Sequence, residues 1–345
     1  NNGLIHYDSL TYIWTRRNAV TPAMFKAQTW RDLKTMAKIE DPIEFELFKN
    51  AIFAIGDEMA VTICRTTYSG VLRDNMDFST ALADANGKMV AQGLTLPGHL
   101  GSIPAALAVV VERFAGDIHP GDMFILNDPF DGGMHLPDIF IFQPLYHEGK
   151  RVAFAATISH HSDVGGRVPG SNASDSTEIY QEGLRIPPLK LFDQGKRNET
   201  MWSLIEKNVR IPIQVLGDLR AQLAACHIAE TQFAELLERY GLEKVTLYME
   251  EVIDYAERLT RAAIAELPDG QWSFEDWIDD DGIDLDRPIR LFVTLTKSGE
   301  EITVDWTGSS EQVKGAINNS LSFTVAHSVA GIRSVLPLNI PSNEG

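Results

Sequence analysis

Residues 122–166 read DMFILNDPFDGGMHLPDIFIFQPLYHEGKRVAFAATISHHSDVGG, and they indicate more about the fold than any other stretch. They contain three apolar runs of strand length, Asp122–Asn127, Ile139–Leu145 and Val152–Ser159, and loops rich in Gly, Asp and His separate or follow these runs. Short apolar runs bounded by turn residues are typical of buried strands. The stretch therefore predicts strands whose ends, and the polar residues beside them, share one edge of a sheet.

Helices are predicted on both sides of this stretch. Asp41-Pro42 offers an N-cap residue followed by a proline at the first helical position, and apolar residues at helical spacing then predict a helix over 42–66. Similar patterns predict helices over 103–115, 214–240 and 243–266. Because only a short break separates the last two, we expect them to form an antiparallel helical hairpin.

Further strands are predicted before and after these helices. Phe78–Asp84 and Met89–Gln92 are apolar runs joined through Asn86-Gly87, a dipeptide typical of β-hairpin turns. Ile289–Thr296 and Glu301–Trp306 form a second pair of runs around a glycine-containing turn. The chain is therefore expected to mix β-hairpins with long helices.

The composition is that of a globular protein with a strong negative charge. The 345 residues include 30 Lys and Arg against 48 Asp and Glu, which gives a formal net charge of −18. Nucleic-acid binding is not expected, because contact with phosphates requires clustered basic side chains. No apolar run approaches the roughly 18 residues of a membrane span, and 2 cysteines are too few for a disulfide framework. We therefore expect a cytoplasmic protein with neither a nucleic-acid nor a membrane partner.

The segment Asn127–Asp138 gathers side chains that can bind a metal ion. Within it, His135 and Asp138 are three residues apart, on a turn that Pro137 stiffens. An imidazole and a carboxylate held at this spacing can bind the same cation. On its own such a pair is more often ordinary loop polarity, so the prediction depends on further ligands nearby.

Two other segments supply such ligands. His160-His161-Ser162-Asp163 follows the third predicted strand, and Arg73–Ser79 leads into the strand Phe78–Asp84 and holds acidic residues, one of which can complete a metal shell. Nitrogen and oxygen donors suit Zn²⁺, Mn²⁺ or Fe²⁺ rather than a structural zinc built on thiolates. Three clusters at strand ends favour a metal site at which bound water attacks a carbonyl.

Two features keep both a functional and a structural interpretation. His99 can line a pocket or simply satisfy a turn. Residues 177–188 belong to the long stretch 160–199, which shows little periodicity, and they can form a lid, a subunit contact or a solvated loop. The sequence has no G-x-x-x-x-G-K-[ST] loop, no G-x-G-x-x-G after a strand and no G-x-S-x-G elbow. If the reaction needs a nucleotide, we expect a partner chain to provide its site.

Seven motifs between about Asp41 and Gly345 are shared with a known family, and several of them are long and uncommon. They are DFSTAL (77–82), HLGSIPAA (99–106), NDPFDGGMHLPDI (127–139), HHSDVGG (160–166), TEIYQEGLRIPPLKL (177–191), GDLRAQLAA (217–225) and DWTGSSEQVKGAIN (305–318). On these motifs the sequence resembles the hydantoinase B/oxoprolinase family. The resemblance implies a B-type subunit of ATP-dependent enzymes that open cyclic amides such as hydantoins, 5-oxoproline and caprolactam, with relatives among acetone and acetophenone carboxylase subunits.

The resemblance also implies roles for individual residues. His161 and Asp163 are catalytic or supporting candidates beside the metal. An A-type partner would bind ATP with Mg²⁺ and phosphorylate the amide or ketone oxygen, and this subunit would then finish the reaction at one divalent ion, zinc or manganese. The residues that match the family's metal ligands are Asp77, His135, Asp138 and His160.

We predict from these observations a mixed α/β (α+β) fold, in which long helices flank β-sheets and a metal site lies at strand ends. Its regions are an N-terminal extension (1–40), a metal-binding α/β region (41–199), a helical hairpin region (200–270) and a C-terminal β-containing region (271–345) that we expect to continue further. The predicted function is the metal-dependent catalytic subunit of an ATP-dependent cyclic-amide hydrolase in a hetero-oligomer. The alternatives are a subunit of an ATP-dependent ketone carboxylase and a non-catalytic scaffold that regulates the ATPase subunit.

Overall fold

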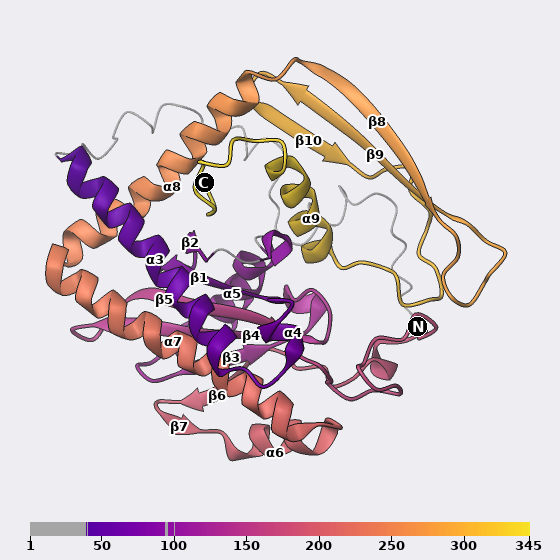
Figure 1. Ribbon diagram of the computed structural model, residues 1–345, viewed down its shortest axis with the longest axis horizontal. Helices are drawn as coiled ribbons and strands as arrows, with labels where there is room; N and C mark the ends of the chain where they lie inside the picture. The colour runs from indigo at the N-terminus through magenta and orange to yellow at the C-terminus, as the bar shows by residue number, and fades with distance from the viewer. Residues whose placement is uncertain (1–38, 40, 94–95, 100) are drawn as a thin grey trace.

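The computed structural model describes residues 39, 41–93, 96–99 and 101–345, and its fold is mixed α/β, as predicted (Figure 1). The strands form two antiparallel sheets. The predicted N-terminal extension lies outside the described residues apart from Ile39. Among the helices that the structure describes, none is long and apolar enough to cross a membrane.

The predicted strands and helices of residues 41–267 and 289–306 are confirmed to within a few residues at each end. The large sheet contains β1 (Phe78–Asp84), β2 (Met89–Gln92), β3 (Met123–Leu126), β4 (Asp138–His147), β5 (Lys150–His160), β6 (Leu189–Asp193) and β7 (Lys196–Arg197), and the small sheet contains β8 (Gly270–Ile278), β9 (Ile289–Ser298) and β10 (Glu301–Asp305). The helices are α3 (Pro42–Thr66), α4 (Gly70–Arg73), α5 (Ser102–Arg113), α6 (Glu199–Asn208), α7 (Pro212–Tyr240), α8 (Leu242–Ala265) and α9 (Leu321–Arg333), and short 3₁₀ turns are η2 (Pro97–His99), η3 (Pro129–Asp131) and η4 (Ile179–Gln181).

Helix α3 begins where the sequence predicts. The Asp41 carboxylate accepts hydrogen bonds from the backbone N–H groups of Ile43 (2.9 Å) and Glu44 (3.1 Å), and Pro42 occupies a position where an N–H would have no helical partner. Its buried face repeats every three or four residues and packs along α7 and on the large sheet. That face consists of Phe45, Phe48, Ile52, Ile55, Gly56, Met59, Ala60 and Ile63.

Helices cover both faces of the large sheet, whose strand order is β2-β1-β5-β4-β3-β6-β7. On β4, Ile139 and Ile141 pack in the core formed with α3 and α7, whereas Phe140 and Phe142 pack in a second core formed with α5. Successive side chains of a strand point to opposite faces, and the buried apolar residues within 153–158 of β5 divide in the same way. Along these parts of β4 and β5, the odd-numbered residues therefore face α7 and the even-numbered residues face α5.

The predicted helical hairpin needs a correction. Helices α7 and α8 follow each other at Gly241, but they diverge as a V, and α7 packs mainly along α3 (Figure 1). Gly241 has a positive φ of 77° and an extended ψ of 153°, which turns the chain sharply between the two helices. The apolar face of α7 is therefore covered mainly by α3, a helix from a much earlier part of the chain.

The stretch 160–199 is more ordered than its weak periodicity indicates. Its last part forms β6 and β7, which extend the large sheet beyond β3. Helix α9 and strand β8 were also not predicted individually, although residues 271–345 were expected to contain β-structure. Strand β8 pairs with β9 over its full length but buries little of its own side-chain surface. Its apolar residues alternate only from Trp272 to Phe274 before two acidic residues interrupt the pattern, so the sequence signal for a strand is weak.

Candidate metal centre

Three segments of the chain meet at one edge of the large sheet. Neighbouring strands run antiparallel, so β1 and β4 begin at the edge where β5 ends: Asp138 pairs with His160, and Phe78 pairs with Ser159. Just beyond the strands, the backbone N–H of His160 donates a hydrogen bond to the carbonyl of Asp77 (3.0 Å). The shared edge that the sequence predicts is therefore present.

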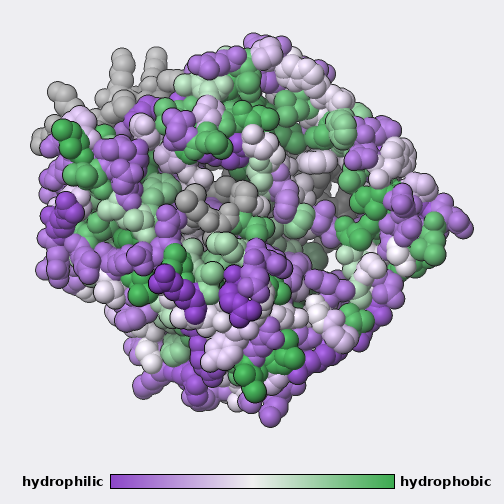
Figure 2. Space-filling view, viewed as in Figure 1, coloured by the Kyte–Doolittle hydropathy of each residue, from purple (hydrophilic) through white to green (hydrophobic). Residues whose placement is uncertain are grey.

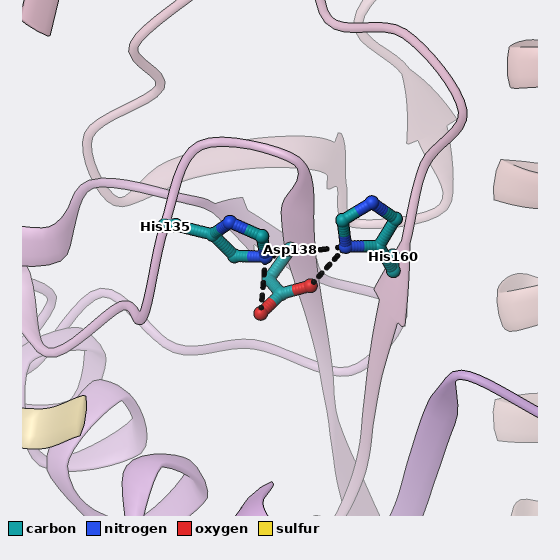
Figure 3. Close-up of side chains that lie close together, drawn as sticks. All are labelled: His135, Asp138 and His160. Atoms are coloured by element: carbon teal, nitrogen blue, oxygen red, sulfur yellow. Dashed lines mark hydrogen bonds and ion pairs between the residues drawn. The ribbon is translucent and has the colours of Figure 1, made fainter. Parts of the chain in front are cut away.

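Three predicted metal-binding side chains touch one another at this edge (Figure 3). Nε2 of His135 lies 3.1 Å from Oδ2 of Asp138, and Nδ1 of His160 lies 3.3 Å from Oδ1 of Asp138. The two imidazole nitrogens are themselves 3.1 Å apart. One donor atom from each residue lies within 4.8 Å of the other two, which makes this a group able to hold one metal ion.

Asp77 stands at the border of this group. Its Oδ2 is 3.9 Å from Nδ1 of His160, and its side chain is 32% exposed. The residue precedes β1, whose neighbour in the sheet is β5, so its position follows from the strand pairing. The four residues matched to metal ligands are thus brought to one place, although Asp77 is not among the three in direct contact.

Two glycines shape the loop that carries His135. Gly132 has a φ of 93°, in the left-handed region that favours glycine, and a Cβ there would lie 2.7 Å from the backbone of α5. A Cβ on Gly133 would lie 2.7 Å from the carbonyl oxygen of Asp128. The amide of Asn127 also donates to the Leu136 carbonyl at 2.6 Å. The loop is therefore held tightly on both sides of His135.

In this cluster, His135 and Asp138 each favour the charged form of the other. Burial alone would raise the pKa of the Asp138 carboxyl, but its hydrogen bond and charge interaction with His135 outweigh burial and hold that pKa well below its usual value. Burial lowers the pKa of His135, but the adjoining Asp138 carboxylate outweighs it, so the net pKa is raised. Asp138 is therefore a carboxylate, as a metal ligand must be.

Two further titratable groups surround the cluster. His99 is 3% exposed, its Nδ1 lies 2.9 Å from Oγ of Ser79, and burial lowers its pKa although the charge of Asp138 opposes the shift. Burial raises the pKa of Glu182, against which the charge of His135 acts. The His99 ring is thus held against β1 and lies near the charges of Asp138 and Asp77, and its role in a pocket or a turn stays a prediction.

The two residues suggested as catalytic have different surroundings. His161 follows β5, has no exposed surface, and lies 3.0 Å through Nε2 from Oε1 of Gln222 on α7. Asp163 is 2% exposed and accepts hydrogen bonds from the backbone N–H groups of Gly165 (3.1 Å) and Arg210 (2.9 Å) and from the Arg210 guanidinium (3.0 Å). Their catalytic role stays a prediction, and their contacts show that both fix the chain where it leaves β5.

The donor atoms fit a divalent cation. Metal bonds of about 2.0–2.1 Å in a tetrahedral shell place ligand atoms about 3.3 Å apart, close to the 3.1–3.3 Å found among His135, Asp138 and His160. Oδ1 of Asp138 is also buried without a well-aligned hydrogen bond among the described residues, although it is only 3.3 Å from His160. Buried polar atoms are normally paired, and a cation would satisfy this one.

Comparison with known protein families matches residues 41–345 to hydantoinase B/oxoprolinase. The chain belongs to the hydantoinase B/oxoprolinase family. The B-type subunit of the putative D-/L-hydantoinase of Pseudomonas sp. (strain NS671) is 33% identical over 91% of this chain and 55% of that protein. The beta chain of the caprolactamase of Pseudomonas jessenii is 34% identical over 88% of this chain and 52% of its own length. The chain thus spans about half the length of these relatives.

Solved structures of similar proteins give the same result. The ATP-dependent caprolactamase from Pseudomonas jessenii superposes with a TM-score of 0.82 at 33% identity, covering 89% of this chain and 53% of that one. The nucleotide-free acetone carboxylase has a TM-score of 0.87 at 20% identity, covering 94% of this chain and 45% of its own, and so shows a shared fold. The mixed α/β fold is therefore the fold of the hydantoinase B/oxoprolinase family.

Sequence reasoning passed over two residues in the hydantoinase B/oxoprolinase motifs of this chain. Glu182 lies in TEIYQEGLRIPPLKL and Gln222 in GDLRAQLAA. Both motifs were recognised, but a glutamate in a loop and a glutamine in a helix carry no spacing signal toward the distant residues His135 and His161. Only the folded chain shows these pairs.

Proposed function

We propose that this chain is the metal-dependent catalytic subunit of an ATP-dependent cyclic-amide hydrolase. The observation that supports it is the group of three donor atoms from His135, Asp138 and His160, which are 3.1–3.3 Å apart at one end of the sheet. The His135 side chain is 37% exposed, so a substrate can reach the cluster from solvent. Relatives named hydantoinase, caprolactamase and 5-oxoprolinase support cyclic amides as the substrate class.

The residues of the site would have two roles, binding the metal ion and positioning its ligands. His135, Asp138 and His160 would hold one zinc or manganese ion, and Asp77 is close enough to add a second carboxylate. Such an ion, when bound, polarises a carbonyl and lowers the pKa of water. The two carboxylates would balance the charge of the ion. His161 and Asp163 would act through the backbone by fixing the strand end that presents His160.

A partner subunit would activate the substrate by phosphorylating it with ATP. Resonance makes amides poor electrophiles, and phosphorylation of the amide oxygen would make the carbon easier for water to attack. The sequence contains neither G-x-x-x-x-G-K-[ST] nor G-x-G-x-x-G after a strand, and two relatives are named as subunits. We therefore assign ATP and Mg²⁺ to an A-type partner in a cytoplasmic hetero-oligomer.

The test is ATP-dependent turnover by the complex of this chain with its A-type partner. Hydantoin, 5-oxoproline and caprolactam form the substrate panel, and ADP and the ring-opened product are measured. Chelation should abolish turnover, and Zn²⁺ or Mn²⁺ should restore it. His160→Ala should reduce turnover at least about 100-fold, because removal of one ligand leaves too few donors for a stable site.

The matched control is His227→Ala, since the His227 side chain is 73% exposed on α7 and far in sequence from the metal-binding residues. It should retain full activity. An active His160→Ala complex would favour a non-catalytic scaffold and overturn the proposal. Turnover of acetone or acetophenone that depends strictly on bicarbonate would instead identify a carboxylase.

A further inference from the structure

Gln222 of α7 contacts two strands of the large sheet with one amide group. It has no exposed surface. Its Nε2 donates hydrogen bonds to the carbonyl oxygen of Ile139 on β4 (2.8 Å) and to Oγ1 of Thr157 on β5 (3.2 Å), and its Oε1 lies 3.0 Å from Nε2 of His161, just after β5. One side chain therefore links the helix to both strands and to the residue that follows them.

These contacts adjoin the residues of the candidate metal centre. Ile139 follows Asp138 along β4, and His161 follows His160 at the end of β5. The backbone N–H of His161 also donates to the carbonyl of Pro137 (2.8 Å). Because successive side chains point to opposite faces, Gln222 holds both strands from the α7 side where they project the metal donors on the α5 side.

The hydrogen bonds fix the orientation of both side chains. The Ile139 carbonyl can only accept, so the nitrogen of the Gln222 amide must face it and the oxygen must face His161. Nε2 of His161 then carries a hydrogen and donates a hydrogen bond to Oε1 of Gln222. Nδ1 of His161 is buried and has no hydrogen-bond partner among the described residues. The glutamine is thus the contact that orients this ring.

The same helix also fixes the approach to β1. The carboxylate of Asp218, one turn before Gln222, accepts hydrogen bonds from the backbone N–H groups of Tyr68 (2.7 Å) and Ser69 (3.1 Å). A Cβ on Gly217 would lie 2.5 Å from the Tyr68 ring, so α7 and this segment are in close contact. Helix α7 is therefore a common platform for the segments that reach the sheet edge.

We propose that Gln222 is a positioning residue for the metal centre. By joining β4 to the end of β5, it sets the separation of Asp138 and His160 before a cation binds. The inference rests on the proposed metal-dependent function. Loss of outer contacts that orient metal ligands typically weakens metal binding about 10- to 100-fold, and the same loss is expected here.

The test is Gln222→Met in the full chain assembled with its partner subunit. Methionine keeps the length and volume of the side chain but removes all its hydrogen bonds. We expect the dissociation constants for Zn²⁺ and Mn²⁺, measured by competition with a chromophoric chelator, to rise about 10- to 100-fold. The visible spectrum of bound Co²⁺ should change as well, because it reports on ligand geometry.

Gln222→Asn provides a second variant. It keeps the amide but is one methylene shorter, so it cannot reach Ile139 and His161 together, and we expect an intermediate loss of affinity. This variant decides the question if Gln222→Met does not fold. Metal-free thermal unfolding of every variant separates a change of stability from a change of metal affinity.

Gln143→Met is the matched control. Gln143 is also a buried glutamine of β4 on the α7 face, and its side-chain oxygen has no hydrogen-bond partner among the described residues. Its metal affinity should stay within about twofold of wild type. Unchanged affinity in both Gln222 variants, or equal losses at Gln143 and Gln222, would overturn the inference. Wild type that binds no metal would instead overturn the proposed function itself.

Discussion

Phenylalanines in the two sheets meet opposite environments. Phe142 of β4 has no exposed surface, whereas Phe274 of β8 is 65% exposed, and its neighbours Trp272 and Trp277 are 47% and 52% exposed. Figure 2 shows green hydrophobic and purple hydrophilic residues interspersed toward the upper right, where Figure 1 places the small sheet. The side chains of the large sheet are thus mostly buried, whereas those of the small sheet are mostly exposed to solvent.

This difference explains why the candidate metal centre belongs to the large sheet. A one-residue slip of a strand moves every side chain to the other face, and burial on both faces makes such a slip very costly. The pairing of Asp138 with His160 is therefore fixed, and their donor atoms stay within 3.3 Å. In a sheet with exposed faces the register between strands is less strongly fixed, so metal-binding side chains on neighbouring strands would be less precisely placed.

Phe142→Ala should break the large sheet most severely. Truncation of a fully buried phenylalanine costs about 3–5 kcal/mol of the free energy of unfolding, because it removes apolar contacts and leaves a cavity. The centroid of its ring lies 6.0 Å from that of Phe140, and the two rings stack in the core on the α5 face. Urea titration followed by circular dichroism measures the change. A loss below about 1 kcal/mol would show that this face of the sheet is not tightly packed.

The large sheet could be predicted because burial leaves a pattern in the sequence. Continuous apolar runs mark β4 and β5, and the Asn-Gly turn marks the β1–β2 hairpin. Strand β8 could not be predicted, because its alternating apolar side chains bury little surface and polar residues interrupt them. Helix α9 has only two buried residues, Ser322 and Ala326, and was missed for the same reason.

Acid should affect the connection between β8 and β9. The Asp281 carboxylate accepts hydrogen bonds from the backbone N–H groups of Asp284 (2.7 Å), Ile283 (2.9 Å), Gly315 (3.0 Å) and Lys314 (3.0 Å), and these bonds lower its pKa from 3.8 to about 2. Because the folded pKa lies below the unfolded one, this contribution to stability is complete above about pH 4 and is lost as the pH falls toward about 2.

Asp281→Asn isolates that contribution. The variant cannot ionise, so it should be less stable than wild type at about pH 5, and the difference should shrink at about pH 3 and below. Urea titrations of both proteins at each pH measure it, and the effect should be smaller than that of Phe142→Ala. A difference that does not change with pH would mean that the carboxylate charge contributes nothing to this turn.

The candidate site could be predicted in part, for reasons that lie in the strand geometry. Residues at strand ends share an edge, so His135, Asp138, His160 and Asp77 could be grouped before their distances were known. The direction of His161 follows only from counting along β5, which requires the exact end of the strand. Gln222 is 61 residues from its partner His161, and no local pattern links a helix to a strand end at such a separation.

Phe274→Ser should have the smallest effect and tests the small sheet directly. Phe274 lies opposite Val293 in the register of β8 and β9, and a substitution at a mostly exposed position usually changes stability by less than about 0.5 kcal/mol. The measurement is the same urea titration, made once on this chain alone and once on its complex with the proposed partner subunit. Equal small effects would mean that the face stays exposed to solvent in both states. A loss above about 1 kcal/mol confined to the complex would show that another polypeptide covers this sheet, and the contrast between the two sheets would then hold only for the isolated chain.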